Sequence, residues 1–258
     1  MVLSQSWLST FLRCPSLAGR ELRGELPERN TDATELGSAW HLYAEQRANG
    51  YSSSEAEFAA FEYLEEAEFE HVQLKKMSTI EQRLTTLIET YETQIHEHLS
   101  EDGLVEYGFH VPLVEHDGWS IELKGSIDRI DEDHGLIDFK TAGRTGEGSP
   151  WDESTLKHKI QADAYTYAAD QLDLCDPTTM TYVVATKGPR QERVEWLPVS
   201  KGPDDWAWLK QVGVSALEAA LADSWPVNHT SHLCSSKWCD AWLQCRGKVI
   251  ETAAAIAA

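Results

Sequence analysis

The stretch from Gly125 to Thr141 constrains the fold of this chain more than any other. Apolar and polar residues alternate from Trp119 to Ile130, which is typical of a strand with one buried face. Residues 131–135 read Asp-Glu-Asp-His-Gly, a composition that turns a strand back. A second, mostly apolar segment follows at residues 136–140. We therefore expect a β-hairpin at the centre of a sheet.

The predicted hairpin carries two acids and a lysine where they can meet. Asp128 lies near the end of the first strand, and Asp138 and Lys140 lie two residues apart on the second. Side chains two apart in a strand point to the same face of the sheet. Two carboxylates can hold a hard divalent cation, and a nearby ammonium can orient a water for attack on a phosphate. The alternative is an ordinary hairpin whose acids and lysine form minor surface ion pairs.

This hairpin resembles the core of the PD-(D/E)xK nuclease superfamily, in which an acid shortly after a glycine, a turn, and a strand bearing Asp-x-Lys follow one another. The likeness is greatest to the RecB-like exonuclease branch, which includes CRISPR-associated RecB-like nucleases and many phage exonucleases. The resemblance implies an α/β fold of the restriction-endonuclease type. Such a fold has a mixed central sheet flanked by helices, here with an N-terminal helical elaboration.

A histidine motif precedes the hairpin. Gly37 and His41 are four residues apart in a predicted helix, so they share one face. A lone histidine on a helix is usually a packing or surface residue, but Gly-x-x-x-His upstream of the two acids is similar to what the RecB-like branch shows. The resemblance implies His41, Asp128 and Asp138 as ligands of Mg²⁺ or Mn²⁺, with the backbone carbonyl of Phe139 completing the shell.

A second helical motif follows the hairpin. Gln161 and Tyr165 are also four residues apart and face together, although Gln-x-x-x-Tyr by itself carries little information. Downstream of Asp-x-Lys it resembles the additional motif of the RecB-like branch. The resemblance implies that these two residues help to hold the DNA strand or the metal-bound water. It also implies that Lys140 orients the attacking water and stabilises charge that develops on the phosphate.

Helices dominate the first hundred residues. Asp32-x-x-Glu35 and Ser78-x-x-Glu81 are capping-box patterns, and they predict that helices begin near residues 32 and 78. Apolar residues at helical spacing follow the second pattern, which favours a scaffold helix without chemistry of its own.

Cysteines form a second chemical signal, at Cys234, Cys239 and Cys245 near one end of the sequence and at Cys14 near the other. Three clustered thiols lack one of the four ligands that a tetrahedral or cubane site requires, and Cys14 is the obvious supplier. This distribution resembles the iron-sulfur subset of RecB-like nucleases, which implies a 4Fe-4S cluster on these four cysteines. In that subset two residues more often separate the first two late cysteines, whereas four do here. Structural Zn²⁺ and isolated reduced thiols are the alternatives.

The net charge of -21 opposes tight nonspecific binding to duplex DNA. The acid is concentrated locally, because residues 55–70 contain seven glutamates and no lysine or arginine. The basic residues are Arg13, Arg20, Arg23, Lys157, Lys159, Lys187, Arg190 and Arg193, among others. This distribution favours a narrow channel for single-stranded DNA over a broad duplex-binding surface.

The length of 258 residues and the hydrophobic content of 41% allow one large domain. We expect a single nuclease domain over 1–258, with a helical part at 1–105, the catalytic sheet at 106–200, and a last helix with the cysteine cluster at 201–250. No apolar run approaches the roughly 18 residues of a membrane span, and a secretory signal is not evident. We therefore expect no membrane partner and a cytoplasmic location.

Together these motifs predict a metal-dependent DNA exonuclease that hydrolyses phosphodiester bonds from the ends of single-stranded DNA, in recombination, repair or phage DNA metabolism. The sequence contains no Gly-x-x-x-x-Gly-Lys-Ser/Thr phosphate loop, so any motor would be a separate helicase or recombinase. The alternative is a catalytically silent DNA-binding or assembly module that keeps the fold and a structural metal cluster. Retention of both acids together with Lys140 argues against this alternative.

Overall fold

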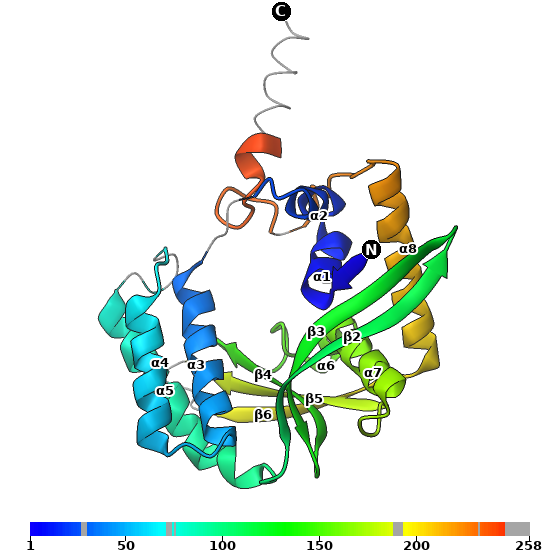
Figure 1. Cartoon of the computed structure of the whole chain (residues 1–258). Coiled ribbons are helices and arrows are strands. Elements are labelled where there is room, and N and C mark those ends of the chain that lie inside the picture. The colour runs from blue at the N-terminus through cyan, green and yellow to red at the C-terminus, as the bar shows by residue number, and fades with distance from the viewer. Residues whose placement is uncertain (27–29, 71–73, 75, 188–192, 232, 246–258) are drawn as a thin grey trace, which may run out of the picture.

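The computed structural model in Figure 1 describes residues 1–26, 30–70, 74, 76–187, 193–231 and 233–245. Its helices are α1 (Gln5–Arg13), α2 (Pro15–Leu22), α3 (Asp32–Ala48), α4 (Ser53–Glu66), α5 (Met77–Gln94), the short 3-10 helix η1 (His96–His98), α6 (Glu153–Leu156), α7 (Ile160–Leu172) and α8 (Pro203–Leu221). Its strands are β1 (Val2–Ser4), β2 (Leu104–His116), β3 (Trp119–Asp131), β4 (Gly135–Ala142), β5 (Thr179–Thr186) and β6 (Val194–Ser200). Among these described helices, none is both long enough and apolar enough to span a bilayer.

The strands form one six-stranded mixed sheet in the order β1-β3-β4-β5-β6, with β2 pairing with β3 off this path. The β1–β3 and β4–β5 pairs are parallel, and the other pairs are antiparallel. This confirms the predicted α/β fold, a mixed sheet flanked by helices. Strand β1 was not predicted, because three residues are too few to show an alternating pattern.

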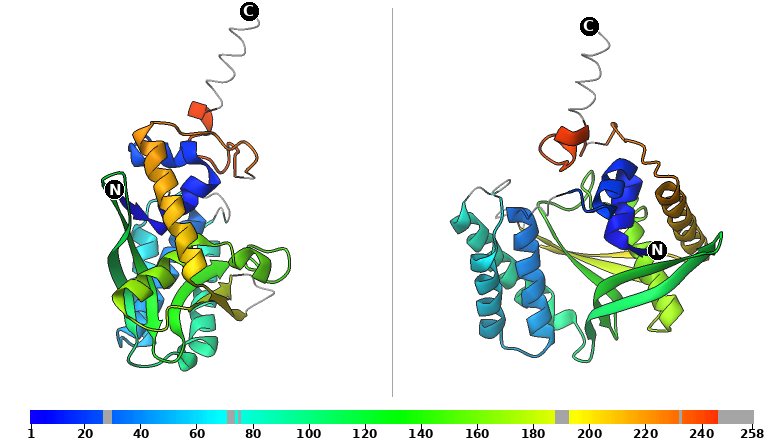
Figure 2. Two further views of the ribbon diagram at one scale, coloured as in Figure 1. Left: turned by 90° about the vertical axis from the view of Figure 1, so that its right-hand side faces the viewer. Right: turned by 45° about the horizontal axis from the view of Figure 1, so that its top comes forward.

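Two apolar cores cover the two faces of the sheet. Leu136 and Tyr182 face a core built with α1, α7 and α8, whereas their neighbours Ile137 and Val183 face a core built with α3, α4 and α5. The two groups of helices stand on opposite sides of the sheet in Figure 1 and in the right-hand view of Figure 2. Because both faces are covered, β4 and β5 are buried at most positions, including the polar Asp138 of β4.

Strands β3 and β4 separate soon after their turn. They pair only where Arg129, Ile130 and Asp131 meet residues 135–137, while β4 continues to pair with β5 as far as Ala142. The edge of β4 beyond residue 137 therefore lacks a ladder partner on the β3 side. The backbone N–H of Phe139 on this edge donates a hydrogen bond to Asp128 Oδ2 at 2.7 Å instead. This separation creates the polar opening in which the predicted site residues meet.

The helix starts predicted near residues 32 and 78 are observed, but the predicted caps are wrong. The side chain of Thr31 caps α3, and Asp32 lies buried in the first turn, where its carboxylate accepts the backbone N–H of Leu74. Helix α5 begins at Met77 after Lys76, with no side-chain cap, so Ser78 already lies inside the helix. The sequence pattern at Asp32 does not reveal that its carboxylate bonds a distant backbone N–H and does not cap the helix.

Candidate metal centre

The structure brings the predicted site residues together where β3 and β4 separate. His41 comes from α3 on one side of the sheet, and Gln161 and Tyr165 come from α7 on the other. The strands between them supply the two aspartates, the lysine and the Phe139 backbone. The contacts that join the set run from His41 to Asp128, from Asp128 to Phe139, from Lys140 to Asp138 and from Gln161 to both Asp138 and Tyr165.

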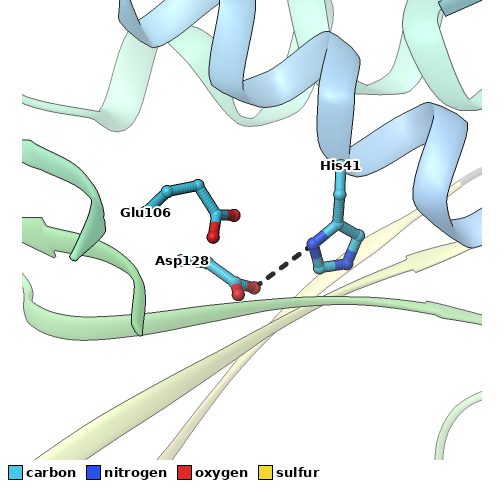
Figure 3. A group of neighbouring side chains, drawn as sticks. All are labelled: His41, Glu106 and Asp128. Atoms are coloured by element: carbon cyan, nitrogen blue, oxygen red, sulfur yellow. Dashed lines mark ion pairs between the residues drawn. The ribbon is translucent and has the colours of Figure 1, made fainter. Parts of the chain in front are cut away.

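His41, Glu106 and Asp128 offer ligand atoms that all lie within 4.8 Å of one another (Figure 3). His41 Nδ1 lies 3.5 Å from Asp128 Oδ2. The two carboxylates are donors that Mg²⁺ and Mn²⁺ prefer, and the imidazole nitrogen is a donor that suits transition metals. This group therefore fits a divalent cation, which would also offset the negative charge gathered here.

Glu106 is a site residue that sequence reasoning missed. In the register of the β2–β3 pair it lies opposite Asp128, since Val105 pairs with Arg129 and Tyr107 with Ile127. Its φ is +46°, a left-handed conformation that costs a non-glycine residue about 1–3 kcal/mol and that concentrates at functional sites. An exposed glutamate in an alternating strand carries no signal that separates it from its neighbours, so only the three-dimensional pairing identifies it.

The backbone of Phe139 serves both sides of this group. Its N–H holds the Asp128 carboxylate, and its backbone also hydrogen-bonds the ring of His41. Burial and the charge of Lys140 lower the pKa of His41, against the opposing effects of Asp138, Glu106 and that hydrogen bond. The neutral imidazole that results is the form that binds a metal. Whether the Phe139 carbonyl also binds the ion remains a prediction.

Asp138 is fully buried beside this group rather than within it. Gln161 Nε2 donates to Asp138 Oδ1 at 2.7 Å and to the Tyr165 hydroxyl at 3.1 Å, and the Lys140 ammonium contacts Asp138 Oδ2. Among the described residues, its carboxylate does not belong to the set of mutually close ligand atoms. The structure thus divides the predicted residues into a His41–Asp128 group and an Asp138–Lys140–Gln161 group.

Burial governs the electrostatics of the two aspartates. It raises the pKa of Asp128 to about 6, although Lys140 and the Phe139 N–H act in the opposite direction. It likewise raises the pKa of Asp138 to about 6, with Lys140 opposing and Asp128 adding to the rise. Burial disfavours the charged form of Lys140, but Asp138 and Asp128 outweigh it and raise the pKa of the ammonium. Burial disfavours the charged form of both carboxylates, and a nearby divalent cation would favour that charged form.

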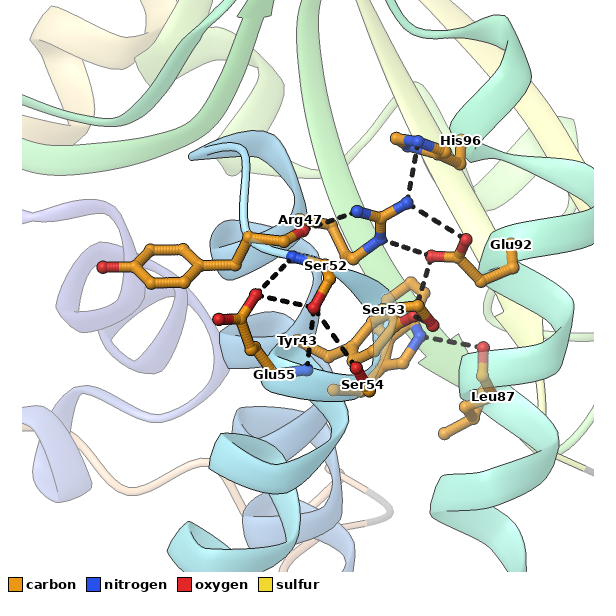
Figure 4. Close-up of polar contacts among 11 residues, drawn as sticks. Tyr43, Arg47, Ser52, Ser53, Ser54, Glu55, Leu87, Glu92 and His96 are labelled. Carbon is orange, nitrogen blue, oxygen red and sulfur yellow. Dashed lines mark hydrogen bonds and ion pairs between the residues drawn. The ribbon is translucent and has the colours of Figure 1, made fainter.

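A polar network behind α3 fixes the helix that carries His41 (Figure 4). Arg47 Nε and the Tyr43 hydroxyl both donate to Glu92 Oε1 of α5, each at 2.7 Å. Arg47 Nη2 also lies 3.0 Å from His96 Nε2, and the buried Trp40 Nε1 donates to the Leu87 carbonyl at 3.1 Å. Helix α3 is therefore held against α5 on both sides of His41, which limits how far the imidazole can move.

The four predicted cluster cysteines line one pocket, together with Trp238 and Trp242: Cys14, Cys234, Cys239 and Cys245. Burial raises the pKa of the Cys239 thiol, and Cys234 and Cys14 are close enough to add to the rise. None of the described cysteines is in a disulfide, and Cys175 lines a different pocket.

Hydrogen bonds near this pocket join the first and last described segments. Asn228 Nδ2 donates to the Arg13 carbonyl at 2.8 Å, Ser16 N donates to the Pro226 carbonyl at 3.1 Å, and Arg20 Nη1 donates to Gln244 Oε1 at 2.8 Å. The segments that carry Cys14 and the late cysteines thus lie side by side without relying on the thiols alone. The pocket shares no residue with the cavity at His41 and Asp128.

Comparison with protein families shows the family to which this chain belongs. The family model of the PD-(D/E)XK nuclease superfamily matches residues 2–246. The chain belongs to the PD-(D/E)XK nuclease superfamily. Its residues His41, Asp128, Asp138 and Lys140 all fall inside the matched range, and the superfamily generally uses divalent metals.

Solved structures agree with this membership at the level of the fold. A structure from Eubacterium rectale described as a "putative exonuclease" aligns with a TM-score of 0.60 and 13% identity, covering 88% of this superfamily member and 84% of that chain. The structure of SSO0001 covers 91% of this chain and 92% of its own at 16% identity, but its TM-score of 0.39 is too low to support an argument. No curated protein matches the sequence.

Proposed function

We propose that this protein is a Mg²⁺- or Mn²⁺-dependent deoxyribonuclease of the RecB-like branch that degrades single-stranded DNA from its ends. The observation that carries the proposal is the meeting of His41, Glu106 and Asp128 beside Asp138 and Lys140, in a chain of a nuclease superfamily. The similar fold of the solved structure described as a "putative exonuclease" supports this choice among nucleases.

The proposed roles follow from the contacts. His41, Glu106 and Asp128 would hold the ion, with Asp138 and the Phe139 carbonyl as further oxygen donors. A bound divalent cation supplies polarisation of the phosphate and acidification of a water. The Lys140 ammonium, held by Asp138 and about a quarter exposed, donates a hydrogen bond to the attacking water or to a phosphate oxygen. Gln161 fixes the Asp138 carboxylate, and Tyr165 fixes Gln161.

The choice of single-stranded DNA rests on charge. A net charge of -21 disfavours long contacts with a duplex, whereas one strand led to the site needs only a few cations. Without a phosphate loop for ATP, the protein would receive its strand from a separate helicase or recombinase in recombination, repair or phage DNA metabolism. The proposed location is the cytoplasm, where such partners act.

We propose further that Cys14, Cys234, Cys239 and Cys245 hold a 4Fe-4S cluster that ties the last segment of a single domain to its first helices. The shared pocket and its two tryptophans, which would limit solvent access, support this.

One assay tests the proposed activity. End-labelled single-stranded DNA, the matching duplex and closed circular DNA are incubated with Mn²⁺ or Mg²⁺, with and without a chelator. We expect metal-dependent release of short products from the single strand and little attack on the closed circle. Efficient cutting of the closed circle without regard to ends would overturn the exonuclease proposal, and activity that survives chelation would overturn the metal proposal.

A further inference from the structure

Lys159 stands directly before α7, the helix that supplies Gln161 and Tyr165. Its side chain is half-buried, and its Nζ lies 4.4 Å from the ring centroid of Trp151. The Trp151 ring in turn packs at 5.7 Å against the buried Tyr182 of β5. The lysine is therefore held in place by an aromatic face that is itself anchored on the sheet.

The segment that carries Trp151 is fixed by its own hydrogen bonds. Arg193 Nη2 donates to Thr145 Oγ1 at 2.8 Å, and the Asp152 carboxylate accepts the backbone N–H groups of Gly148 and Thr155 at 3.0 and 2.9 Å. The backbone N–H of Trp151 donates to Ser149 Oγ at 3.1 Å. Trp151 is consequently a stable support for the Lys159 ammonium.

The charge of Lys159 is not matched by a protein acid. Within the described residues no carboxylate lies within 4.0 Å of its ammonium, whereas Lys140 pairs with Asp138 and Lys201 lies 2.6 Å from Asp163 of α7. Burial lowers the pKa of Lys159, the charge of Lys140 lowers it further, and Asp138 acts against both. A cation–π contact holds the ammonium in place but does not neutralise its charge. Among the described side chains, Lys159 therefore has no carboxylate as an ion-pair partner of its own, and the nearby Asp138 is already paired with Lys140.

The position of this unmatched cation suggests which anion is absent. Lys159 is two residues from Gln161, which donates a hydrogen bond to the Asp138 carboxylate, and the charges of Lys140 and Asp138 both act on Lys159. A nucleic-acid strand that presents one phosphate to Lys140 brings its neighbouring phosphates along the same side of the site. The chain is otherwise strongly acidic, so a fixed cation beside the site contributes more to guiding a strand than one on the outer surface.

We propose that Lys159, braced by Trp151, binds a backbone phosphate of the substrate strand next to the phosphate that is cleaved. The inference rests on the proposed nuclease function and deepens it by assigning a sequence-independent subsite. The phosphate oxygen accepts a charged hydrogen bond from the ammonium, and no base edge is read. Lys159 is a binding residue in this proposal and takes no part in bond cleavage.

Binding is measured first, separately from cleavage. A fluorescent single-stranded oligonucleotide is titrated with the wild type and with Lys159→Met, Lys159→Arg, Trp151→Leu and Lys157→Met, with Ca²⁺ in place of Mg²⁺ and at several salt concentrations. We expect Lys159→Met to bind roughly 10-fold more weakly, as loss of one charged hydrogen bond predicts. The slope of log affinity against log salt should fall in magnitude by about 0.7, the value for one phosphate contact on a single strand.

The other variants separate charge from packing. Lys159→Arg should keep the salt slope, and Trp151→Leu should weaken binding about 2- to 5-fold with the slope nearly unchanged, because only the support of the cation is lost. Lys157→Met is the matched control, since that side chain is exposed and only its backbone carbonyl is used, by Lys201 Nζ at 2.8 Å. It should match the wild type. Melting temperatures of all variants identify any loss that is due to misfolding.

A neutral methylphosphonate, moved one linkage at a time along the oligonucleotide, locates the subsite. At one position it should weaken the wild type but leave Lys159→Met unchanged. Wild-type affinity and salt slope in Lys159→Met, or a wild type that fails to bind the strand, would overturn the inference. Wild-type protein that binds the strand through Lys159 but does not cut it with Mg²⁺ or Mn²⁺ would instead overturn the proposed function and leave the phosphate subsite standing.

Discussion

The metal centre and the cysteine pocket are built in opposite ways. The metal centre depends on a hairpin whose strands are adjacent in sequence, and helices on both sides of the sheet complete it. The pocket depends on Cys14 meeting residues near position 240, which lie nearly the whole chain length away. The first arrangement gathers charged groups around the proposed metal site, and the second brings the segments of Cys14 and Cys245 together. We therefore expect substitutions at the metal centre to lower activity and substitutions at the cysteine pocket to lower stability.

The largest expected effect is loss of catalysis at the metal centre. Asp128→Ala, Asp138→Ala and Lys140→Ala should each lower kcat by about 10²–10³-fold or more, because each removes a group that stabilises the transition state. Single-turnover cleavage of end-labelled DNA and an independent binding assay measure the effect, with the exposed turn residue Asp133→Asn as control. Full activity in either aspartate variant would remove the assignment.

Substitutions in the cysteine pocket should lower stability before they lower activity. Cys14→Ala, Cys234→Ala, Cys239→Ala and Cys245→Ala should each lower stability by several kcal/mol, on the order of the loss of a long cross-link, with activity falling only as a consequence. Melting temperature, iron and sulfide content, and visible absorption of anaerobically purified protein are the measurements, and Cys175→Ala is the control. A colourless protein that contains one zinc ion would show that the site holds zinc in place of the cluster. A metal-free protein whose melting temperature is the same in all four cysteine variants would refute the proposed cross-link.

Glu106 offers a smaller and sharper test of the metal centre. Glu106→Gln keeps the size of the side chain but removes a charged ligand, so the affinity for Mn²⁺ should fall about 10- to 100-fold, in the range found for groups around metals. Titration of activity with Mn²⁺ measures this, and Glu115→Gln, an exposed glutamate on the same strand, serves as the control. Equal Mn²⁺ requirements in both variants would exclude Glu106 from the site.

The smallest expected effect concerns pH. Because burial raises the pKa of Asp128 and Asp138 from 3.8 to about 6, these groups stabilise the metal-free protein most below about pH 4, and that contribution is lost as pH rises through about 6. A bound cation favours the ionised carboxylates, so metal affinity should fall below about pH 6. Melting curves with and without Mg²⁺ between pH 4.5 and 8 should converge at the acid end.

Asp163 requires attention in that experiment, because burial also raises its pKa to about 6 despite its contact with Lys201. Asp163 titrates both with and without metal, so its effect on the melting temperature is the same in the two curves and cancels when one is subtracted from the other. A difference that stays constant across this pH range would show that the two site aspartates do not titrate as expected.

The sequence was most informative where local periodicity and chemistry coincide. The hairpin, Asp128, Asp138 and Lys140 were predictable because alternation with a period of two assigns side chains to faces. His41, Gln161 and Tyr165 could be proposed only through the order of motifs in a known family, and the structure does place them at the same opening.

The features that were missed depend on tertiary structure. Glu106 is selected by its register against Asp128 and by a left-handed backbone that alternation does not encode. Strand β1 gains its place from pairing with β3 over only three residues. The separation of Asp138 from the close ligand group, through its contacts with Lys140 and Gln161, is likewise a property of the packed sheet and helix.

The contact between the segment of Cys14 and the segment of Cys245 sets an order of events during synthesis. Ribosomes deliver the hairpin with Asp128 and Asp138 well before Cys234, so the sheet and its metal ligands can form while Cys14 still has no partners. The proposed cluster requires the thiol of Cys14 to stay reduced throughout that interval. Contact between these two segments thus forms after the hairpin has been made, and a chain whose translation stops early carries the proposed catalytic groups without the proposed cysteine cross-link.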